Sequence, residues 1–179
     1  TGSMTTAGLA IVAICKKGLE KKVPAKTLAE ALNDPGAEVE SLRPITGLKM
    51  GSSIITELTA RKVNKLVGHF PMTLNYKTGD GRAQSADVIA KVKPLDEEVV
   101  LMINSMASMC GGKLASNHNK FKNKLGFNGC HTRELGVFAQ TDERFTKHMP
   151  KVYGVHEDPT REAYVLTMEL LKDMVLMDT

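Results

Sequence analysis

The chain has 179 residues, of which 42% are hydrophobic and 25% charged, and its formal net charge is +4. This is the composition of a soluble globular domain that is long enough to bury one core. Basic residues are scattered, so nucleic-acid binding is permitted but not indicated. Three cysteines without metal-ligand spacing predict a reduced, cytoplasmic protein. The longest apolar run is far too short for a membrane span, so we expect no membrane partner. Because the basic residues are scattered, we also expect no nucleic-acid partner.

The first 35 residues predict helices ahead of the main domain. Thr1-Gly2-Ser3 before the first methionine is typical of a cloned tag and is set aside. Residues 9–19 have apolar side chains at helical spacing and are followed by lysines and a proline, which mark a helix end. A second short helix is predicted to begin at Pro24 and to end at residues 33–36. A basic amphipathic helix on a membrane surface is the alternative, although packing on the chain's own domain is commoner.

Residues 39–45 and 54–60 predict two strands that flank a stretch of small residues, Gly51-Ser52-Ser53. Strand, small-residue loop and strand outline a loop that covers phosphates, because small residues let backbone N–H groups approach anionic oxygens. An ordinary hairpin is the alternative unless a lysine strand and a nucleotide pocket follow.

Residues 70–93 predict a β-hairpin whose turn is Thr78-Gly79-Asp80-Gly81. In its second strand, period-two alternation places Ile89, Lys91 and Lys93 on one face. An edge strand whose lysines discourage aggregation is the alternative interpretation.

Residues 95–114 predict one helix, whose methionines at helical spacing we interpret as core packing. The polar, basic residues 116–124 have little to bury and predict a poorly ordered, mobile loop.

The last third of the chain predicts a helix followed by two strands. Asn128 can cap the helix, which carries Glu134, Leu135, Val137 and Phe138 on or near its inner face. The strands are residues 149–155 and 162–171, joined by a turn over residues 156–161.

In this order, the elements resemble the N-terminal lobe of a protein-kinase-like phosphotransferase. The residues are similar to the aminoglycoside phosphotransferase/choline kinase branch, especially the ecdysteroid-kinase-like (CHK-like) family. The matching segments are residues 34–39, Met50-Gly51-Ser52-Ser53, Ile89-Ala90-Lys91, residues 132–138, residues 149–154 and residues 164–171. The resemblance covers residues 34–173 and implies an α+β fold with a five-stranded antiparallel sheet, an acidic helix and added N-terminal helices.

The resemblance also divides the chain and assigns a site. Residues 36–173 would be the lobe, residues 1–35 the tag remnant and N-terminal helices, and residues 174–179 the start of a connection to a C-terminal lobe. Lys91, with Lys93 as runner-up, would contact the α- and β-phosphates of ATP, and Glu134 would hold it. A solvated helix surface is the alternative role of Glu134. The other implied contacts are Gly51, Ser52 and Ser53 over the phosphates and Glu169 to Leu171 as the hinge beside the base.

Such a lobe would serve a kinase that transfers the ATP γ-phosphate to a hydroxyl of a small metabolite. The catalytic aspartate and the Mg²⁺-binding aspartate belong to the C-terminal lobe. We therefore expect this chain by itself to be inactive and to bind nucleotide weakly at best. Its final apolar residues predict self-association or folding back over the nucleotide face. They are Leu170, Leu171, Met174, Val175, Leu176 and Met177.

Two other function classes stay open at this point. One is a non-catalytic kinase-like binding or interaction domain. The other is a basic nucleic-acid-binding module, for which the candidate residues are Lys113, Lys120, Lys122 and Lys124. A metal site is improbable, because the histidines are widely separated and no cysteine pairs support them. They are His69, His118, His131, His148 and His156.

Overall fold

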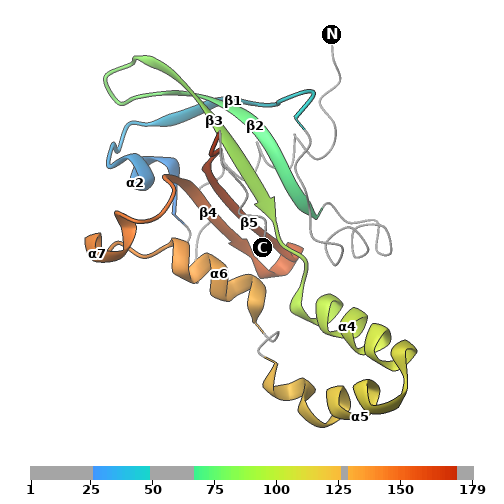
Figure 1. The fold of residues 1–179 in the computed structure, drawn as a ribbon. Helices are drawn as coiled ribbons and strands as arrows, with labels where there is room; N and C mark the ends of the chain where they lie inside the picture. The colour runs from blue at the N-terminus through green and yellow to red at the C-terminus, as the bar shows by residue number, and fades with distance from the viewer. Residues whose placement is uncertain (1–25, 49–66, 126–128, 173–179) are drawn as a thin grey trace.

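The computed structural model describes residues 26–48, 67–125 and 129–172, and these residues form an α+β fold around a five-stranded antiparallel sheet (Figure 1). The strands lie in the order β1-β2-β3-β5-β4. Their bounds are β1 Glu38–Pro44, β2 Gly68–Lys77, β3 Ala83–Val92, β4 Val152–Asp158 and β5 Ala163–Glu169. The helices are α2 Leu28–Leu32, α4 Asp96–Cys110, α5 Gly112–Phe121, α6 Cys130–Phe138 and α7 Glu143–Thr146, with short 3-10 turns η1 Lys122–Lys124 and η2 Pro159–Arg161.

The predicted hairpin is confirmed as β2 and β3, which pair without a break from Gly68 opposite Val92 to Lys77 opposite Ala83. Its turn is closed by the Thr78 N–H, which donates to the Arg82 carbonyl at 2.9 Å. The turn residues therefore join two strands that keep one continuous register.

The hairpin turn is held against the chain that enters β1. The Asp34 carboxylate accepts from the Gly79 N–H at 2.7 Å and from the Gly36 N–H at 3.1 Å. The two backbones lie so close that a Cβ on Gly36 would stand 2.5 Å from the Gly79 Cα. Glycine is therefore required at residue 36.

Two apolar clusters cover the two faces of the sheet. The first joins Val88 and Ala90 of β3 to Leu28 of α2. The second joins Leu166 of β5 to Leu135 of α6, which is only 1% exposed. Because Lys91 pairs with Leu166 across the β3–β5 ladder, Lys91 lies on the face that α6 covers.

At the N-terminal side, the predicted second helix is confirmed as α2, which ends at Leu32, but it begins later than predicted, and Pro24 lies outside the described residues. Lys26 instead forms an isolated antiparallel bridge with Val155 of β4. The helix begins at Leu28, because the Thr27 hydroxyl accepts from the Glu30 N–H and the Glu30 carboxylate accepts from the Thr27 N–H. The predicted helix over residues 9–19 and the predicted strand over residues 54–60 lie outside the described residues.

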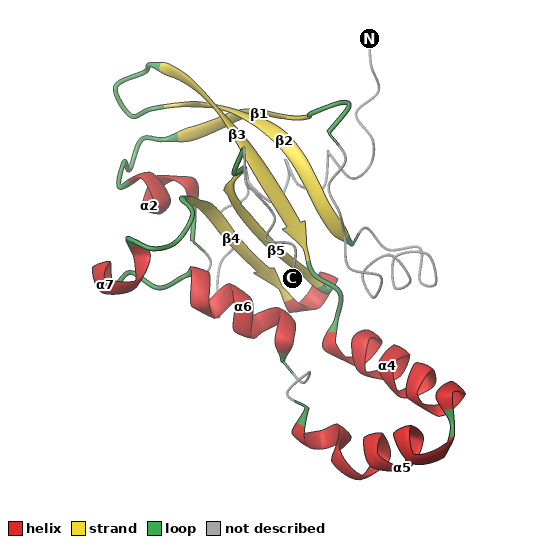
Figure 2. Ribbon diagram, viewed as in Figure 1, coloured by secondary structure: helices red, strands yellow, loops and turns green. Residues whose placement is uncertain are grey.

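The predicted helix over residues 95–114 is confirmed only as far as Cys110, where α4 ends and the chain reverses. Gly111 and Gly112 both have positive φ, at 64° and 56°, and together they separate α4 from α5. Residues 116–124, predicted to be a mobile loop, are the end of α5 followed by η1. In Figure 2 the two helices form an antiparallel pair that projects away from the sheet, which we call the α4–α5 hairpin.

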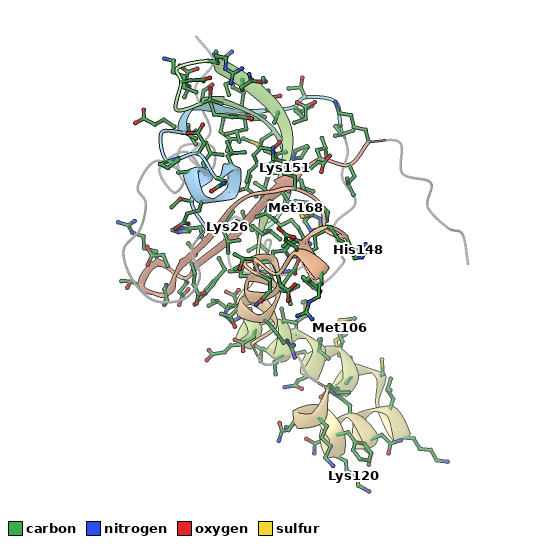
Figure 3. The ribbon with its side chains drawn as sticks, turned by 90° about the vertical axis from the view of Figure 1, so that its left-hand side faces the viewer. Lys26, Met106, Lys120, His148, Lys151 and Met168 are labelled. Carbon is green, nitrogen blue, oxygen red and sulfur yellow. The ribbon has the colours of Figure 1, made fainter. Side chains whose placement is uncertain are left out.

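Met106 and Met109 of α4 do not pack in the core as predicted. Val99, near the start of α4, is buried, but Met106 is exposed and Met109 is 86% exposed. Figure 3 shows Met106 and Lys120 on the projecting α4–α5 hairpin, far from Lys151 and Met168 at the sheet. The helical spacing was identified correctly, but the helix runs away from the core that was expected to cover it.

The last two strands are shifted from their predicted bounds. β4 continues to Asp158, so His156 lies in a strand and not in the predicted turn. The turn is confined to η2, and β5 ends at Glu169. Leu170, expected to lack anything to pack on, is buried. Residues 174–177 lie outside the described residues, and none of the described helices has the length and apolar character to cross a bilayer.

Candidate functional site

Two lysines of β3 and its extension share one carboxylate of α6. The Lys91 ammonium lies 2.6 Å from Glu134 Oε1, which confirms the predicted ion pair. The Lys93 ammonium donates to the other oxygen, Oε2. The lysine side chains are each 19% exposed and the glutamate side chain is 25% exposed. Lys93, which the sequence offered as a substitute for Lys91, is thus a simultaneous partner of the same glutamate.

The strand ladder fixes the two lysines. Lys91 stands opposite Leu166, and the Lys93 N–H donates to the Tyr164 carbonyl at 2.9 Å. The β3–β5 pairing therefore continues to Lys93, although β3 itself ends at Val92. Alternation along an extended chain then sends both side chains to the α6 side.

On the helix side, Leu135 anchors α6 and so places its neighbour Glu134. Leu135 packs against Val152, Val155 and Leu166. Val137, which was predicted on or near the inner face, is instead exposed. Asn128, the predicted cap, lies outside the described residues, and the residue that precedes α6 is Gly129 in the left-handed conformation with φ 68°.

The start of α6 is tied to the start of α4. The Gly129 N–H donates to Asp96 Oδ2 at 2.6 Å, and this bond lowers the pKa of the Asp96 carboxyl. The His131 ring meets the Tyr164 ring edge-on, with centroids 4.3 Å apart. Lys93 is separated from Asp96 by only two residues, so the lysines, the α4 start and the α6 start form one connected corner.

Two opposing effects act on the Glu134 carboxyl. Burial disfavours its charged form, but hydrogen bonds from Lys91 and Lys93 outweigh burial, so the pKa of Glu134 lies below its ordinary value of 4.5. The carboxylate is therefore ionised at neutral pH. Lys91, Lys93 and Glu134 taken alone, two ammonium groups and one carboxylate, sum to one positive charge, which suits an anionic ligand.

The predicted hinge is fastened to both neighbouring strands. The Glu169 N–H donates to the Lys151 carbonyl at 2.7 Å, and its carboxylate accepts from the Lys151 N–H at 3.1 Å. The Leu170 N–H donates to the Asp87 carbonyl at 3.0 Å. These two N–H groups are therefore used by the protein itself, while Leu171 beyond them is exposed.

Asp87 and Lys172 extend this fastening and were not identified from the sequence. The Lys172 ammonium lies 2.6 Å from Asp87 Oδ2, and the Thr73 hydroxyl donates to Oδ1 at 3.0 Å. The bonds from Lys172 and Thr73 lower the pKa of Asp87. The only sequence signal for this contact was Asp87 itself, a carboxylate next to the apolar residues Val88 and Ile89 of β3.

The sequence analysis also predicted a phosphate-covering loop. Gly51, Ser52 and Ser53 lie outside the described residues. Within residues 26–48, 67–125 and 129–172, no three histidine, cysteine or carboxylate side chains are grouped to hold a metal ion. Glu134 is already occupied by two lysines, so it does not fit as a Mg²⁺ ligand.

Comparison of the chain with protein-family models, with curated proteins and with solved structures gives no match.

Proposed function

We propose that this chain provides the nucleotide-binding lobe of a kinase that phosphorylates a hydroxyl of a small metabolite. The observation that carries the proposal is the ion pair between Lys91 of β3 and Glu134 of α6. Phosphoryl transfer depends on positioning the phosphates and neutralising their charge, and protein kinases do this with a lysine on the third strand held by a helix glutamate. Lys91 would bind the α- and β-phosphates of ATP, and Glu134 would orient it.

The sheet topology agrees with this role. β5 lies directly beside the lysine strand, with Glu169 opposite Val88. A base placed at the end of β5, near Leu171, would leave its phosphates pointing along β3 toward Lys91. The described residues hold no group of three carboxylate, histidine or cysteine side chains that would bind the Mg²⁺ that accompanies ATP.

The proposal is tested by titrating the ¹⁵N-labelled chain with ATP, and separately with AMP, and following amide shifts. We expect ATP to shift residues around Lys91 and Glu134 and AMP to shift mainly the end of β5. Lys91→Met should abolish the ATP-specific shifts. Lys77→Met is the matched control, because Lys77 pairs with Glu40 at 2.7 Å in the neighbouring strands, away from the site.

Two results would contradict the proposal: ATP causes no amide shifts, or the ATP-specific shifts persist in Lys91→Met. They would favour the second candidate, a non-catalytic interaction domain of the same fold. The observation in favour of that candidate is the exposed apolar surface of the α4–α5 hairpin, which includes Leu101, Met109 and Leu114.

A further inference from the structure

We propose that the α4–α5 hairpin is a docking surface for an acidic amphipathic helix of a partner protein. Docking there is independent of nucleotide binding, because the hairpin projects away from the sheet (Figure 2). The features that carry it are apolar side chains left unburied, an open seam between the two helices, and basic side chains in a segment that has no acidic ones.

α5 lacks the packing that normally stabilises a helix of its length. It spans ten residues, Gly112–Phe121, and none of them is buried. Helices this short are marginal in water, and in proteins most of their stability comes from the packing of an amphipathic face. In α4 the only buried residue is Val99, near the sheet. A partner that packed on the hairpin would supply the missing contacts.

The apolar stripe of α5 lies beside α4 but is not covered by it. Leu114, His118 and Phe121 are spaced at i, i+4 and i+7, which places them on one face of α5. His118 Nε2 lies 3.1 Å from Asn104 Oδ1 of α4, so this face is turned toward α4. Leu114 is nevertheless 58% exposed and Phe121 43% exposed. The two helices therefore leave an apolar seam that neither of them closes.

A helix is the element that fits such a seam. Helices pack with the side-chain ridges of one in the grooves of another, and an amphipathic helix lays its apolar face along an apolar groove. A bilayer instead receives the apolar side chains on the outer face of a surface helix, whereas the stripe of α5 is turned toward α4. This orientation favours a helical protein partner over a membrane.

The charge of the hairpin selects an acidic partner. Residues 99–133 contain no aspartate or glutamate. The Lys120 ammonium lies 5.3 Å from the centroid of the Phe121 ring, so positive charge adjoins the apolar stripe. Opposite charges across an interface steer association and suppress wrong partners. A second copy of this hairpin would bring like charges together. The exposed lysines of the hairpin and η1 are Lys113, Lys120, Lys122 and Lys124.

Binding is tested with a synthetic amphipathic helix of leucines and glutamates, and with a matched peptide in which lysines replace the glutamates. The ¹⁵N-labelled chain should bind only the acidic peptide, with amide shifts concentrated in residues 99–125. Failure to bind the acidic peptide, equal binding of both peptides, or shifts centred on the sheet would each overturn the proposal.

The apolar stripe is tested with Phe121→Ser, which should weaken binding of the acidic peptide about tenfold or more, because a few aromatic anchors carry most of an interface's affinity. Val137→Ser, at an exposed apolar residue of α6, is the control and should leave binding unchanged. Circular dichroism checks folding, and Leu114→Ser decides the question if Phe121→Ser is unfolded. A stripe variant that folds and binds as the wild type does would overturn the proposal.

The charge is tested with Lys120→Glu combined with Lys124→Glu. This variant should bind the acidic peptide about tenfold more weakly at low salt, and the difference should shrink at high salt. Arg43→Glu combined with Lys147→Glu changes the net charge equally at exposed residues outside the hairpin and should bind nearly as the wild type does. Equal losses in the two variants would mean that only net charge is sensed, which would overturn the proposal.

Other occupants are distinguished by two measurements. A chain that binds vesicles of phosphatidylserine and phosphatidylcholine but no acidic peptide would have a membrane-binding hairpin, and a dimer in sedimentation that dissociates in Phe121→Ser would have a second copy on it. Either result overturns the proposal. The hairpin variants should keep the ATP shifts around Lys91, so a failure of docking is distinguishable from a failure of the proposed function.

Discussion

Two regions of this molecule place lysines in opposite surroundings. At the site, Lys91 and Lys93 are mostly enclosed and share Glu134. In the α4–α5 hairpin and η1, the lysines are exposed, and residues 99–133 contain no aspartate or glutamate to pair with them. The hairpin lysines are Lys113, Lys120, Lys122 and Lys124. Residue type alone therefore does not identify an enclosed, paired lysine; the pairing of its strand and the helix above it do.

Apolar side chains differ between the same two regions. Leu135 and Leu166 beside the site are almost fully buried. Of the ten large hydrophobic side chains that are exposed among the described residues, six lie in residues 101–125. They are Leu101, Met106, Met109, Leu114, Phe121 and Leu125. The region around the site should therefore carry the stability of the fold, whereas substitutions in the hairpin should be nearly neutral.

The largest effect is expected from Leu135→Ala. It removes the side chain that anchors α6 and should lower the free energy of unfolding by about 2–5 kcal/mol. Val137→Ala, on the exposed side of the same helix, is the control and should change it by less than about 0.5 kcal/mol. Chemical denaturation measures both, and equal losses would mean that α6 does not pack as described.

The next effect is expected from Glu134→Gln. The substitution replaces charge-assisted bonds to Lys91 and Lys93 with neutral ones and should cost about 1.5–3 kcal/mol of stability. Glu40→Gln breaks the exposed pair with Lys77 and should cost less than about 1 kcal/mol. A Glu134 variant no less stable than the Glu40 variant would show that the enclosed pair is not stabilising.

The pH dependence of that difference should be smaller and has a definite sign. The folded pKa of Glu134 is lowered, so its contribution is fully present above the usual value of 4.5 and is lost as the pH falls through the folded pKa. Urea unfolding of the wild type and Glu134→Gln from about pH 7 to about pH 3 should show their stability difference shrinking below about pH 4.5. A constant difference over that range would contradict the lowered pKa.

The smallest effect is expected in the hairpin. Met109→Ala truncates a side chain that is 86% exposed and should change the free energy of unfolding by less than about 0.5 kcal/mol. A loss of about 2 kcal/mol or more, measured by the same denaturation, would mean that the hairpin is covered in solution and would remove the contrast between the two regions.

Local patterns predicted the parts of the fold that local chemistry determines. The turn at residues 78–81 sets the β2–β3 hairpin, and alternation places Lys91 and Lys93 on one face. The resemblance of the element order to a kinase lobe then implied the Lys91–Glu134 pair. Sharing of Glu134 by both lysines could not be predicted, because it depends on where the packing of Leu135 sets α6 above the sheet.

Other features were missed for equally physical reasons. α5 is short and mostly polar and has no buried residue, so its few apolar side chains, such as Leu114 and Phe121, did not distinguish a helix from a solvated loop. Gly111 and Gly112 lie near the end of the predicted helix over residues 95–114, but no local pattern predicted the reversal into a second helix there. The contact between Asp87 and Lys172 joins distant parts of the chain, and no local pattern encodes it.

The strand order has a consequence for how the protein is made. β2–β3 and β4–β5 are local hairpins, but the two are joined only when β3 pairs with β5, from Val88 opposite Glu169 to Val92 opposite Val165. Such distant pairing is slow, and during synthesis β3 emerges long before its partner. In that interval β3 is paired with β2 on one side only. Its other side is an open sheet edge, and charged side chains on an edge discourage wrong association. Lys91 and Lys93 would then protect the nascent strand first and meet Glu134 only when β5 closes the sheet.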